Sequence, residues 1–192
     1  MIGMKSQDIV VLLKLVSLQE QGEFAGHGEQ RRGFAGEDPF SVRGLESLTG
    51  ISKTEINASL KRSLSSGLAI KDRDTGRANP HRRNLYEFIV HGLKFVFPAK
   101  AGAMTRGIPT AFAAPMLKGL LVSGGEYIHI WPYAQGRDMG QSVAPLFKSV
   151  PEAVQKDERL YEYLALVDAI RLGNQRQAGL AGQRLSERFL KK

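Results

Sequence analysis

Residues 40–67, FSVRGLESLTGISKTEINASLKRSLSSG, carry the pattern that decides the fold of this chain. Apolar side chains recur at helical spacing on both sides of Gly50, a residue type that suits a left-handed turn. The two runs predict short helices over residues 42–49 and 53–66, and Gly67 stops the second one. Two short helices joined by a tight turn have the sequence shape of a helix-turn-helix.

The start and the two faces of the second predicted helix can be assigned from the sequence. Ser52 followed by Glu55 has the spacing of a capping box, in which each side chain binds the backbone N–H of the other residue. The predicted inner face consists of Ile56, Ser59, Leu60, Ser63 and Leu64. The predicted outer face consists of Lys53, Thr54, Asn57, Ala58 and Lys61. An asparagine can bind adenine through two hydrogen bonds, and lysine or threonine can reach bases or phosphates in the major groove.

A basic hairpin is predicted after this helix. Residues 68–70 read as a short strand, and the polar stretch 71–84 contains turn residues. The return strand is ambiguous, because residues 85–91 fit either a strand or a helix; residues 95–97 are the stronger strand prediction. The cationic tip consists of Lys71, Arg73, Arg77, His81, Arg82 and Arg83. Such a tip can lie along a phosphate strand or insert an arginine into a narrow minor groove.

The candidate DNA-binding residues follow from this arrangement. Those of the two helices are Ser41, Arg43, Ser52, Lys53, Thr54, Asn57 and Lys61. Those of the hairpin are Lys71, Arg73, Arg77, Arg82 and Arg83. The alternative interpretation is an ordinary solvated helix followed by a charged surface loop.

Segment 42–68 resembles the helix-turn-helix core of MarR-like winged-helix transcriptional regulators, and residues 71–83 look like their charged wing. The resemblance covers about residues 5–84 and implies a homodimer on a pseudo-palindromic DNA site, with residues 53–66 as the recognition helix. Beyond the wing the chain departs from these regulators, which usually continue into long dimerisation helices. Its later segments 105–110, 114–117, 149–153 and 164–171 are similar to a group of poorly characterised bacterial winged-helix proteins, and that similarity implies no ligand or activity.

The chain divides into three predicted regions, with an α+β, mainly helical fold. Residues 1–97 form the winged helix-turn-helix domain, with a Gly-rich flexible connector over 22–39. Its opening helix over 4–19 can be capped by Ser6, and it carries an apolar stripe of Ile9, Leu12, Leu13 and Val16. Residues 98–150 form a Gly/Pro-rich linking region that contains a strand at 127–131 and a short helix from Pro115. Residues 151–192 form a predicted dimerisation region with helices over 151–172 and 174–190, whose apolar faces are typical of either a core or a dimer interface.

Composition limits the classes of function. The chain has 192 residues and a formal net charge of +8, and residues 41–84 alone hold nine basic and four acidic side chains. Zero cysteines exclude a disulfide framework, a thiol nucleophile and a Cys-ligated zinc site. No run approaches the ~20 apolar residues that span a bilayer, and no signal peptide is visible, so we expect a cytoplasmic protein without a membrane partner.

No constellation of residues supports catalysis. The histidines are scattered, and the one pair at helical spacing, Glu87 and His91, is typical of a local helix interaction. Phosphate-binding glycine loops and a nucleophile elbow are absent from the sequence, so we expect no enzyme activity, no cofactor and no metal. Arg106, which lies in a Gly- and Pro-containing segment, is a candidate ligand-binding residue for an anion or a carboxylate. The alternative for Arg106 is a rigid surface turn or an arginine paired within the protein.

Two functions are therefore expected from the sequence. The first is a homodimeric transcriptional regulator that binds specific double-stranded DNA. The alternative is an antitoxin-like or accessory interaction module whose C-terminal helices hold a protein partner. The cations between Arg73 and Arg83 favour the first, and the wide apolar face at residues 160–170 is compatible with both.

Overall fold

The computed structural model describes residues 3–24, 37–120 and 127–190, and it has the α+β, mainly helical fold that the sequence predicts. The N-terminal half contains α1 (Ser6–Phe24), α3 (Val42–Thr49), α4 (Lys53–Ser65), β1 (Ala69–Lys71), β2 (Ala78–Pro80), α5 (Arg82–His91) and α6 (Leu93–Val96). The C-terminal half contains β3 (Met104–Pro109), η1 (Ala111–Ala113), η2 (Pro115–Leu117), β4 (His129–Pro132), β5 (Asp138–Ser142), α7 (Val150–Val154), α8 (Glu158–Leu172) and α9 (Gln175–Phe189). None of the helices within these ranges is both long and apolar enough to cross a membrane.

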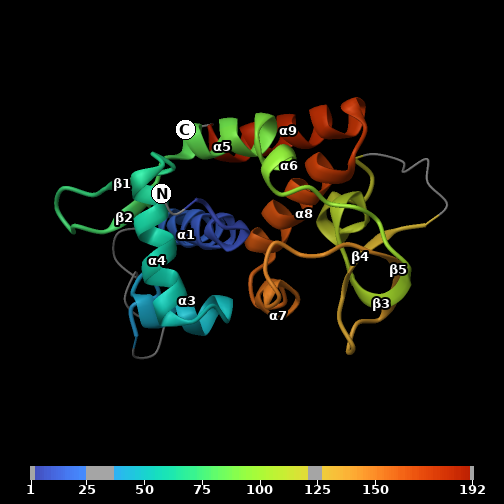
Figure 1. Ribbon diagram of the computed structural model, residues 1–192, viewed down its shortest axis with the longest axis horizontal. Helices are drawn as coiled ribbons and strands as arrows, with labels where there is room; N and C mark the ends of the chain where they lie inside the picture. The colour runs from blue at the N-terminus through green and yellow to red at the C-terminus, as the bar shows by residue number, and fades with distance from the viewer. Residues whose placement is uncertain (1–2, 25–36, 121–126, 191–192) are drawn as a thin grey trace.

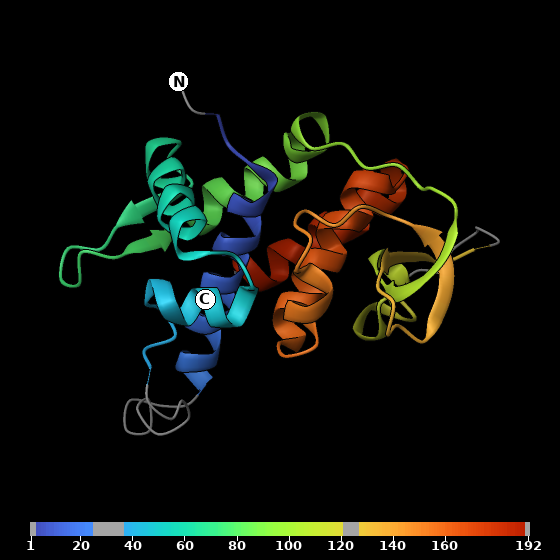
Figure 2. The ribbon, with the colours of Figure 1, turned by 60° about the horizontal axis from the view of Figure 1, so that its bottom comes forward.

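Helix α1 lies near the centre of the molecule. It contacts α3 and α4 on one side and α8 on the other, while α5 packs along α9. Figure 1 shows the β1–β2 hairpin projecting at one end of the molecule and the strands β3, β4 and β5 at the opposite end. The turned view in Figure 2 shows the same order, with α1 and α8 between the two ends.

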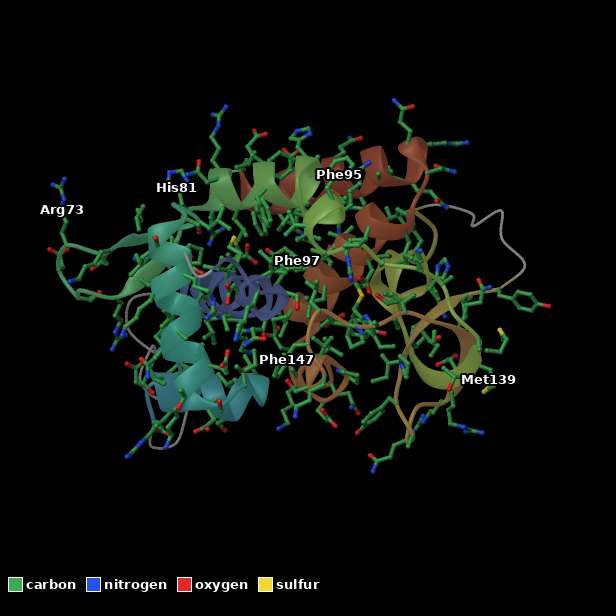
Figure 3. The ribbon with its side chains drawn as sticks, in the orientation of Figure 1. Arg73, His81, Phe95, Phe97, Met139 and Phe147 are labelled. Atoms are coloured by element: carbon green, nitrogen blue, oxygen red, sulfur yellow. The ribbon has the colours of Figure 1, made fainter. Side chains whose placement is uncertain are left out.

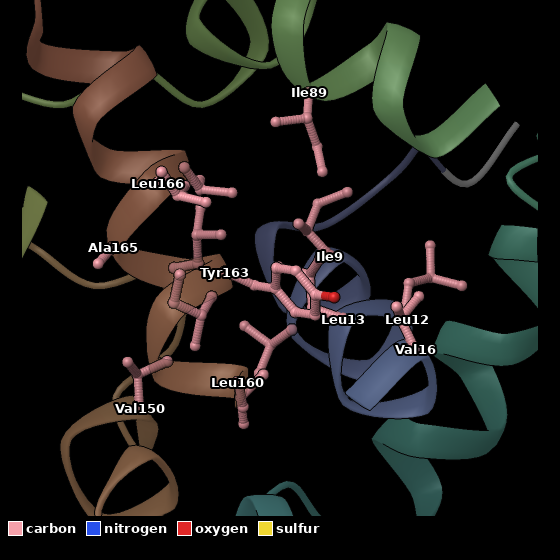
Figure 4. Packing of buried hydrophobic residues seen from close by; sticks show 14 of the residues in the cluster. Ile9, Leu12, Leu13, Val16, Ile89, Val150, Leu160, Tyr163, Ala165 and Leu166 are labelled. Carbon is pink, nitrogen blue, oxygen red and sulfur yellow. The ribbon is translucent and has the colours of Figure 1, made fainter. Parts of the chain in front are cut away.

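The core is built mainly from α1 and α8 (Figure 4). The stripe predicted on the first helix, Ile9, Leu12, Leu13 and Val16, is fully buried as expected. Val10 and Val11 are buried as well, because α1 is covered by neighbours on more than one side.

The first helix begins and ends later than the prediction of residues 4–19. Ser6 was expected to cap it, but Ser6 is its first residue, and its hydroxyl donates to the carbonyl of Leu146 at 2.6 Å. Asp8 takes part in the N-terminal turn instead and accepts from the backbone N–H of Lys5 at 2.9 Å.

The hairpin is shorter than expected, because its return strand ends at Pro80. Ala69 pairs with Pro80 and Lys71 with Ala78 in antiparallel register. Residues 85–91 belong to a helix, and the strand predicted at residues 95–97 is wrong, since Leu93–Val96 is helical. The buried residues Leu85, Ile89 and Leu93 recur every four positions, which is the helical spacing that decides between the two alternatives.

The region over 98–150 contains three strands where the sequence predicted one at residues 127–131. The N-terminal half of β3 pairs with β5, its C-terminal half pairs with β4, and β4 runs parallel to β5, so the three strands close into a small barrel. Closure brings backbones together at glycines: a Cβ at Gly107 would lie 1.9 Å from the carbonyl oxygen of Trp131. The helix expected from Pro115 is a single 3-10 turn.

The helix predicted over residues 151–172 is divided in two. The break falls before Asp157, whose carboxylate accepts from the backbone N–H of Leu160 at 3.0 Å and caps α8. The apolar face at residues 160–170, expected to hold a second subunit or a partner, is buried against the chain's own α1, α9 and η1. This face therefore belongs to the core, as expected for a helix that is apolar around most of its circumference.

Candidate nucleic-acid interface

Helices α3 and α4 are joined by a turn whose ends are capped as the sequence predicts. Ser41 Oγ accepts from the backbone N–H of Gly44 at 2.9 Å and begins α3. Gly50 adopts a left-handed conformation with φ 70°, and its N–H donates to the carbonyl of Glu46 at 2.8 Å. A side chain at Gly50 would be strained by this φ and would also meet Ser149, so the turn requires glycine.

Only half of the predicted capping box forms at the start of α4. Ser52 Oγ accepts from the backbone N–H of Glu55 at 3.4 Å. The Glu55 carboxylate does not bind back to Ser52, because it accepts from Gln7 and from Lys5 Nζ, the latter at 3.3 Å. The capping box prediction was therefore wrong in its second half, since donors on α1 compete for the carboxylate.

The outer face of α4 has the composition that the helical wheel predicts. Its exposed side chains are Lys53, Thr54, Asn57 and Lys61, and Ala58 is half-buried. On the inner face Ile56, Ser59 and Ser63 are buried as expected, but Leu64 is 37% exposed. The helix is turned so that Arg62, rather than Leu64, enters the interior.

Arg62 fixes α4 to α1 through a buried ion pair. Its Nε and Nη2 donate to the two carboxylate oxygens of Asp8 at 2.8 and 2.6 Å, and both side chains are almost inaccessible to solvent. The hydrogen bond with Asp8 raises the pKa of Arg62, so the guanidinium stays charged. Sequence reasoning missed this residue because Lys61-Arg62 reads as two solvated cations. The available signal was the place of Arg62 beside Ser63 and three residues after Ser59 on the inner face.

The tip of the hairpin is held by Asp72. Its Oδ1 accepts from the N–H of Thr75 and from the Thr75 hydroxyl, both at 2.7 Å, and its Oδ2 accepts from Asn79 at 3.2 Å. The bonds from Thr75 lower the pKa of Asp72, which keeps the carboxylate ionised. Arg73 extends into solvent from this ordered turn, at the end of the hairpin in Figure 3.

The cations of this face differ in how they are paired. In the part of the chain that the structure describes, Arg43, Lys61, Lys71 and Arg73 are exposed and make no ion pair. Lys53 lies 3.7 Å from Glu46, which is a weak exposed pair. Arg77 pairs with Asp38.

A hollow of about 340 Å³ between α4 and the hairpin brings predicted residues from three elements together. Asn57, Lys61, Arg77 and Ser41 line it, over an apolar floor that includes Leu60. Residues separated by up to 36 positions in the sequence thus share one surface. The hollow therefore brings the predicted residues Ser41, Asn57 and Lys61 together with the hairpin residue Arg77, whereas Lys71 and Arg73 are exposed on the hairpin outside it.

The other residues assigned to the hairpin tip lie elsewhere. His81 caps α5, where its Nδ1 accepts from the backbone N–H of Asn84 at 3.2 Å. Arg82 lies in the first turn of α5 and donates to Glu20 at 3.3 Å, and Arg83 is exposed on the same helix. Their placement at the tip was wrong because the return strand ends at Pro80, before any of them.

Arg106 lies far from this face. It is exposed in the middle of β3, where it pairs in register with Met139, and β3 is at the opposite end of the molecule from the hairpin in Figure 1. The alternative of a rigid surface turn does not describe it, because residues 104–109 form a strand. The structure brings no other predicted site residue beside Arg106.

The histidines and carboxylates of the described ranges form no metal site. Residues 3–24, 37–120 and 127–190 contain no cluster of three or more His, Cys, Asp or Glu side chains able to hold a metal ion. His91 and Glu87 lie 3.4 Å apart on α5, as a pair at this helical spacing should.

No family model matches the sequence, and no curated protein or solved structure is significantly similar to it.

Proposed function

We propose that this chain is a sequence-specific, duplex DNA-binding transcriptional regulator, with a winged helix-turn-helix formed by α1, α3, α4 and the β1–β2 hairpin. The observation that carries the proposal is the hollow in which the polar outer face of α4 meets a cationic hairpin. Both elements project from the core, and the outer side chains of α4 are exposed.

Helix α4 has the length and the side chains of a recognition helix. An α-helix with its side chains is about 10–12 Å in diameter and the B-DNA major groove is about 12 Å wide, so the thirteen-residue helix can lie in the groove. The N-terminal residues of such a helix meet base edges, which gives Thr54 and Asn57 the reading role. Lys53, Lys61 and Arg43 are placed to contact phosphates.

The hairpin supplies the neighbouring backbone contact. The Asp72 turn orders the tip before any ligand binds, so Arg73 and Lys71 lose little freedom when they bind a phosphate strand or a minor groove. Arg77 adds a third cation once it exchanges Asp38 for a phosphate. Arg82 takes no part in this contact, because it is engaged by Glu20.

A homodimer is part of the proposal, because reading two half-sites about 34–36 Å apart needs two recognition helices at a fixed spacing. The buried face of α8 cannot form the interface. Phe95 and Val96 on α6 are 75% and 52% exposed, and we propose that they form part of the surface that a second copy covers; Phe95 is labelled in Figure 3. The interaction-module alternative loses its main support for the same reason, since it relied on the apolar face at residues 160–170.

Fluorescence polarisation with labelled duplex DNA tests the proposal. A variant with glutamine at Lys53, Lys61, Arg73 and Arg77 is compared with a control variant carrying glutamine at Lys94, Lys100, Lys118 and Arg137. Both lose four exposed cations, but the control positions lie outside the α4–hairpin surface. We expect the first variant alone to bind weakly, with a salt-dependence slope smaller by about 3–4, since each lost phosphate contact contributes about 0.9. Equal losses in the two variants would show that only net charge matters and would contradict the assignment.

A further inference from the structure

A second polar surface lies in a cleft of about 510 Å³ between the C-terminal part of α1, the start of α8 and the outer part of α9. Its charged lining residues are Glu20, Lys156, Asp157, Glu158, Arg159, Glu162, Arg184 and Arg188. None of them belongs to the α4–hairpin surface. The cleft is therefore a separate feature of the molecule.

Glu162 organises the floor of the cleft. Its side chain is only 6% exposed, and its Oε2 accepts from Arg159 at 2.9 Å. Its Oε1 accepts from the Nε of two further arginines, Arg184 at 3.1 Å and Arg188 at 3.3 Å. Three guanidinium groups thus surround one buried carboxylate.

Glu20 forms the adjoining part of the floor. Its Oε1 accepts from the Tyr163 hydroxyl at 2.6 Å and from Arg82 at 3.3 Å, and its Oε2 lies 3.3 Å from Arg159 Nε. Burial and the Glu20 hydrogen bond raise the pKa of Tyr163, so its phenol stays a neutral donor. Four arginines therefore face Glu20 and Glu162, and Arg184 also lies 3.7 Å from Glu187, so the network keeps one positive charge in excess. At the rim, the exposed Lys156 and Glu158 cancel each other.

The uncompensated charge is carried by groups that still have donors to offer. Arg184 and Arg188 are one helical turn apart on α9 and bind Glu162 through Nε, so their terminal nitrogens remain available. Arg188 has no further partner among the described residues, and Arg184 Nη1 has only Glu187, at 3.7 Å. The two side chains are 33% and 31% exposed, so a ligand in the cleft can reach them.

We propose that this cleft is a binding site for a doubly charged oxyanion, the phosphate group of a small molecule or inorganic phosphate itself. Its oxygens accept from the terminal nitrogens of Arg184 and Arg188, since paired guanidinium forks match the geometry of a phosphate. Glu162 holds the two forks in place before the ligand arrives, which reduces the entropy lost on binding. The inference does not depend on DNA binding.

Thermal unfolding of the full chain in inorganic phosphate, compared with chloride at equal ionic strength, tests the site. At phosphate concentrations about ten times Kd, we expect the wild-type Tm to rise by about 3–6 °C. Arg184→Gln/Arg188→Gln should lose this rise, while Arg176→Gln, on the same helix but outside the cleft, should keep it. The double variant also weakens the pairing of Glu162, so the readout is the phosphate-induced shift and not the Tm itself.

A ³¹P NMR titration of the wild type gives a readout that does not depend on any variant folding, and saturable binding to one site is expected. The source of the phosphate is distinguished by repeating the titration with a phosphomonoester such as glycerol phosphate, which binds more tightly if the group belongs to a larger ligand. The proposal is overturned if the wild type shows no saturable response, or if Arg184→Gln/Arg188→Gln responds as the wild type does. It is also overturned if the response is lost in the Lys53, Lys61, Arg73 and Arg77 variant instead, since phosphate would then bind the proposed DNA surface.

Discussion

Cationic side chains are used in opposite ways on the α4–hairpin surface and in the core around α8. On α4 and the hairpin, Lys61 and Arg73 are exposed, and each is without an ion pair in the described structure. On α8, Arg171 is 5% exposed and donates to Asp168 at 2.8 Å. The first arrangement leaves charge available to a partner, and the second uses it to satisfy a carboxylate in the core.

The difference shows that pairing, and not the count of basic residues, separates a candidate binding surface from a structural network. Residues 41–84 hold nine basic and four acidic side chains, and residues 151–192 hold eight and six. The counts of basic residues are similar, but the second segment has more carboxylates within reach of its cations. Substitutions that remove one charge at a time test this contrast.

The largest effect is expected at Asp168. This carboxylate is fully buried and accepts from Arg171, from the Trp131 indole N–H at 2.7 Å and from the Thr110 hydroxyl at 2.8 Å. Asp168→Ala leaves all three donors without their acceptor and should lower the free energy of unfolding by about 3–5 kcal/mol. Glu152→Ala removes an exposed carboxylate from α7 and should cost less than about 1 kcal/mol. Urea denaturation followed by circular dichroism measures both free energies of unfolding. Equal losses in the two variants would contradict the structural role of Asp168.

A smaller, pH-dependent effect is expected at Lys14, whose Nζ lies 2.6 Å from Asp157 with both side chains buried. Burial raises the pKa of Asp157, but hydrogen bonds from Lys14 and from Leu160 N–H outweigh burial, so the net pKa is lowered. A lowered pKa in the folded state means that Asp157 stabilises the protein above pH of about 4, and that this contribution is lost as the pH falls towards the folded pKa.

In the Lys14→Met variant the pKa of Asp157 shifts in the opposite direction. Without the lysine, burial raises this pKa above its value in the unfolded chain. At pH 7 the free energy of unfolding of the variant should be about 3 kcal/mol lower than that of the wild type, which is the lower end of the range for a broken buried pair. This difference should become smaller as the pH falls towards 4. Lys5→Met, which removes an exposed partner of Glu55, should cost less than about 1 kcal/mol. Urea midpoints between pH 4 and pH 7 provide the comparison, and a deficit that is independent of pH would contradict the role of Asp157.

The smallest effects on stability are expected at the proposed DNA surface. Lys61→Gln and Arg73→Gln each remove an exposed cation without a partner in the described residues, so each should change the free energy of unfolding by no more than about 0.5 kcal/mol. Thermal or urea unfolding of the two single variants checks this. A loss above about 1 kcal/mol in either variant would mean that the charge is structural.

What the sequence predicts well here is local. The ends of α3 and α4 depend on Ser41, Gly50 and Ser52, whose capping bonds join residues three or four positions apart. The outer face of α4 follows from the same helical periodicity, so its exposed residues Lys53, Thr54, Asn57 and Lys61 could be named from the sequence. Local patterns therefore located this surface.

What the sequence does not predict depends on contacts between distant segments. Arg62 is 54 positions from Asp8, and no local pattern marks it as buried. Arg82 falls outside the hairpin because the return strand is only three residues long, a length set by packing of α5 on α9. The β3–β5 unit escaped detection because its closure depends on backbone approach at glycines such as Gly107 rather than on alternating apolar residues.

The central claim, that α4 reads the major groove of duplex DNA, is tested most directly by selection from a pool of random duplexes with the wild type and with Asn57→Ala. The account predicts that the wild type enriches a two-fold symmetric consensus, and that Asn57→Ala enriches the same half-site spacing without the preference for adenine at one position, a loss of about 1–3 kcal/mol of discrimination. A pool that stays random with the wild type, or a consensus that Asn57→Ala leaves unchanged, would contradict it.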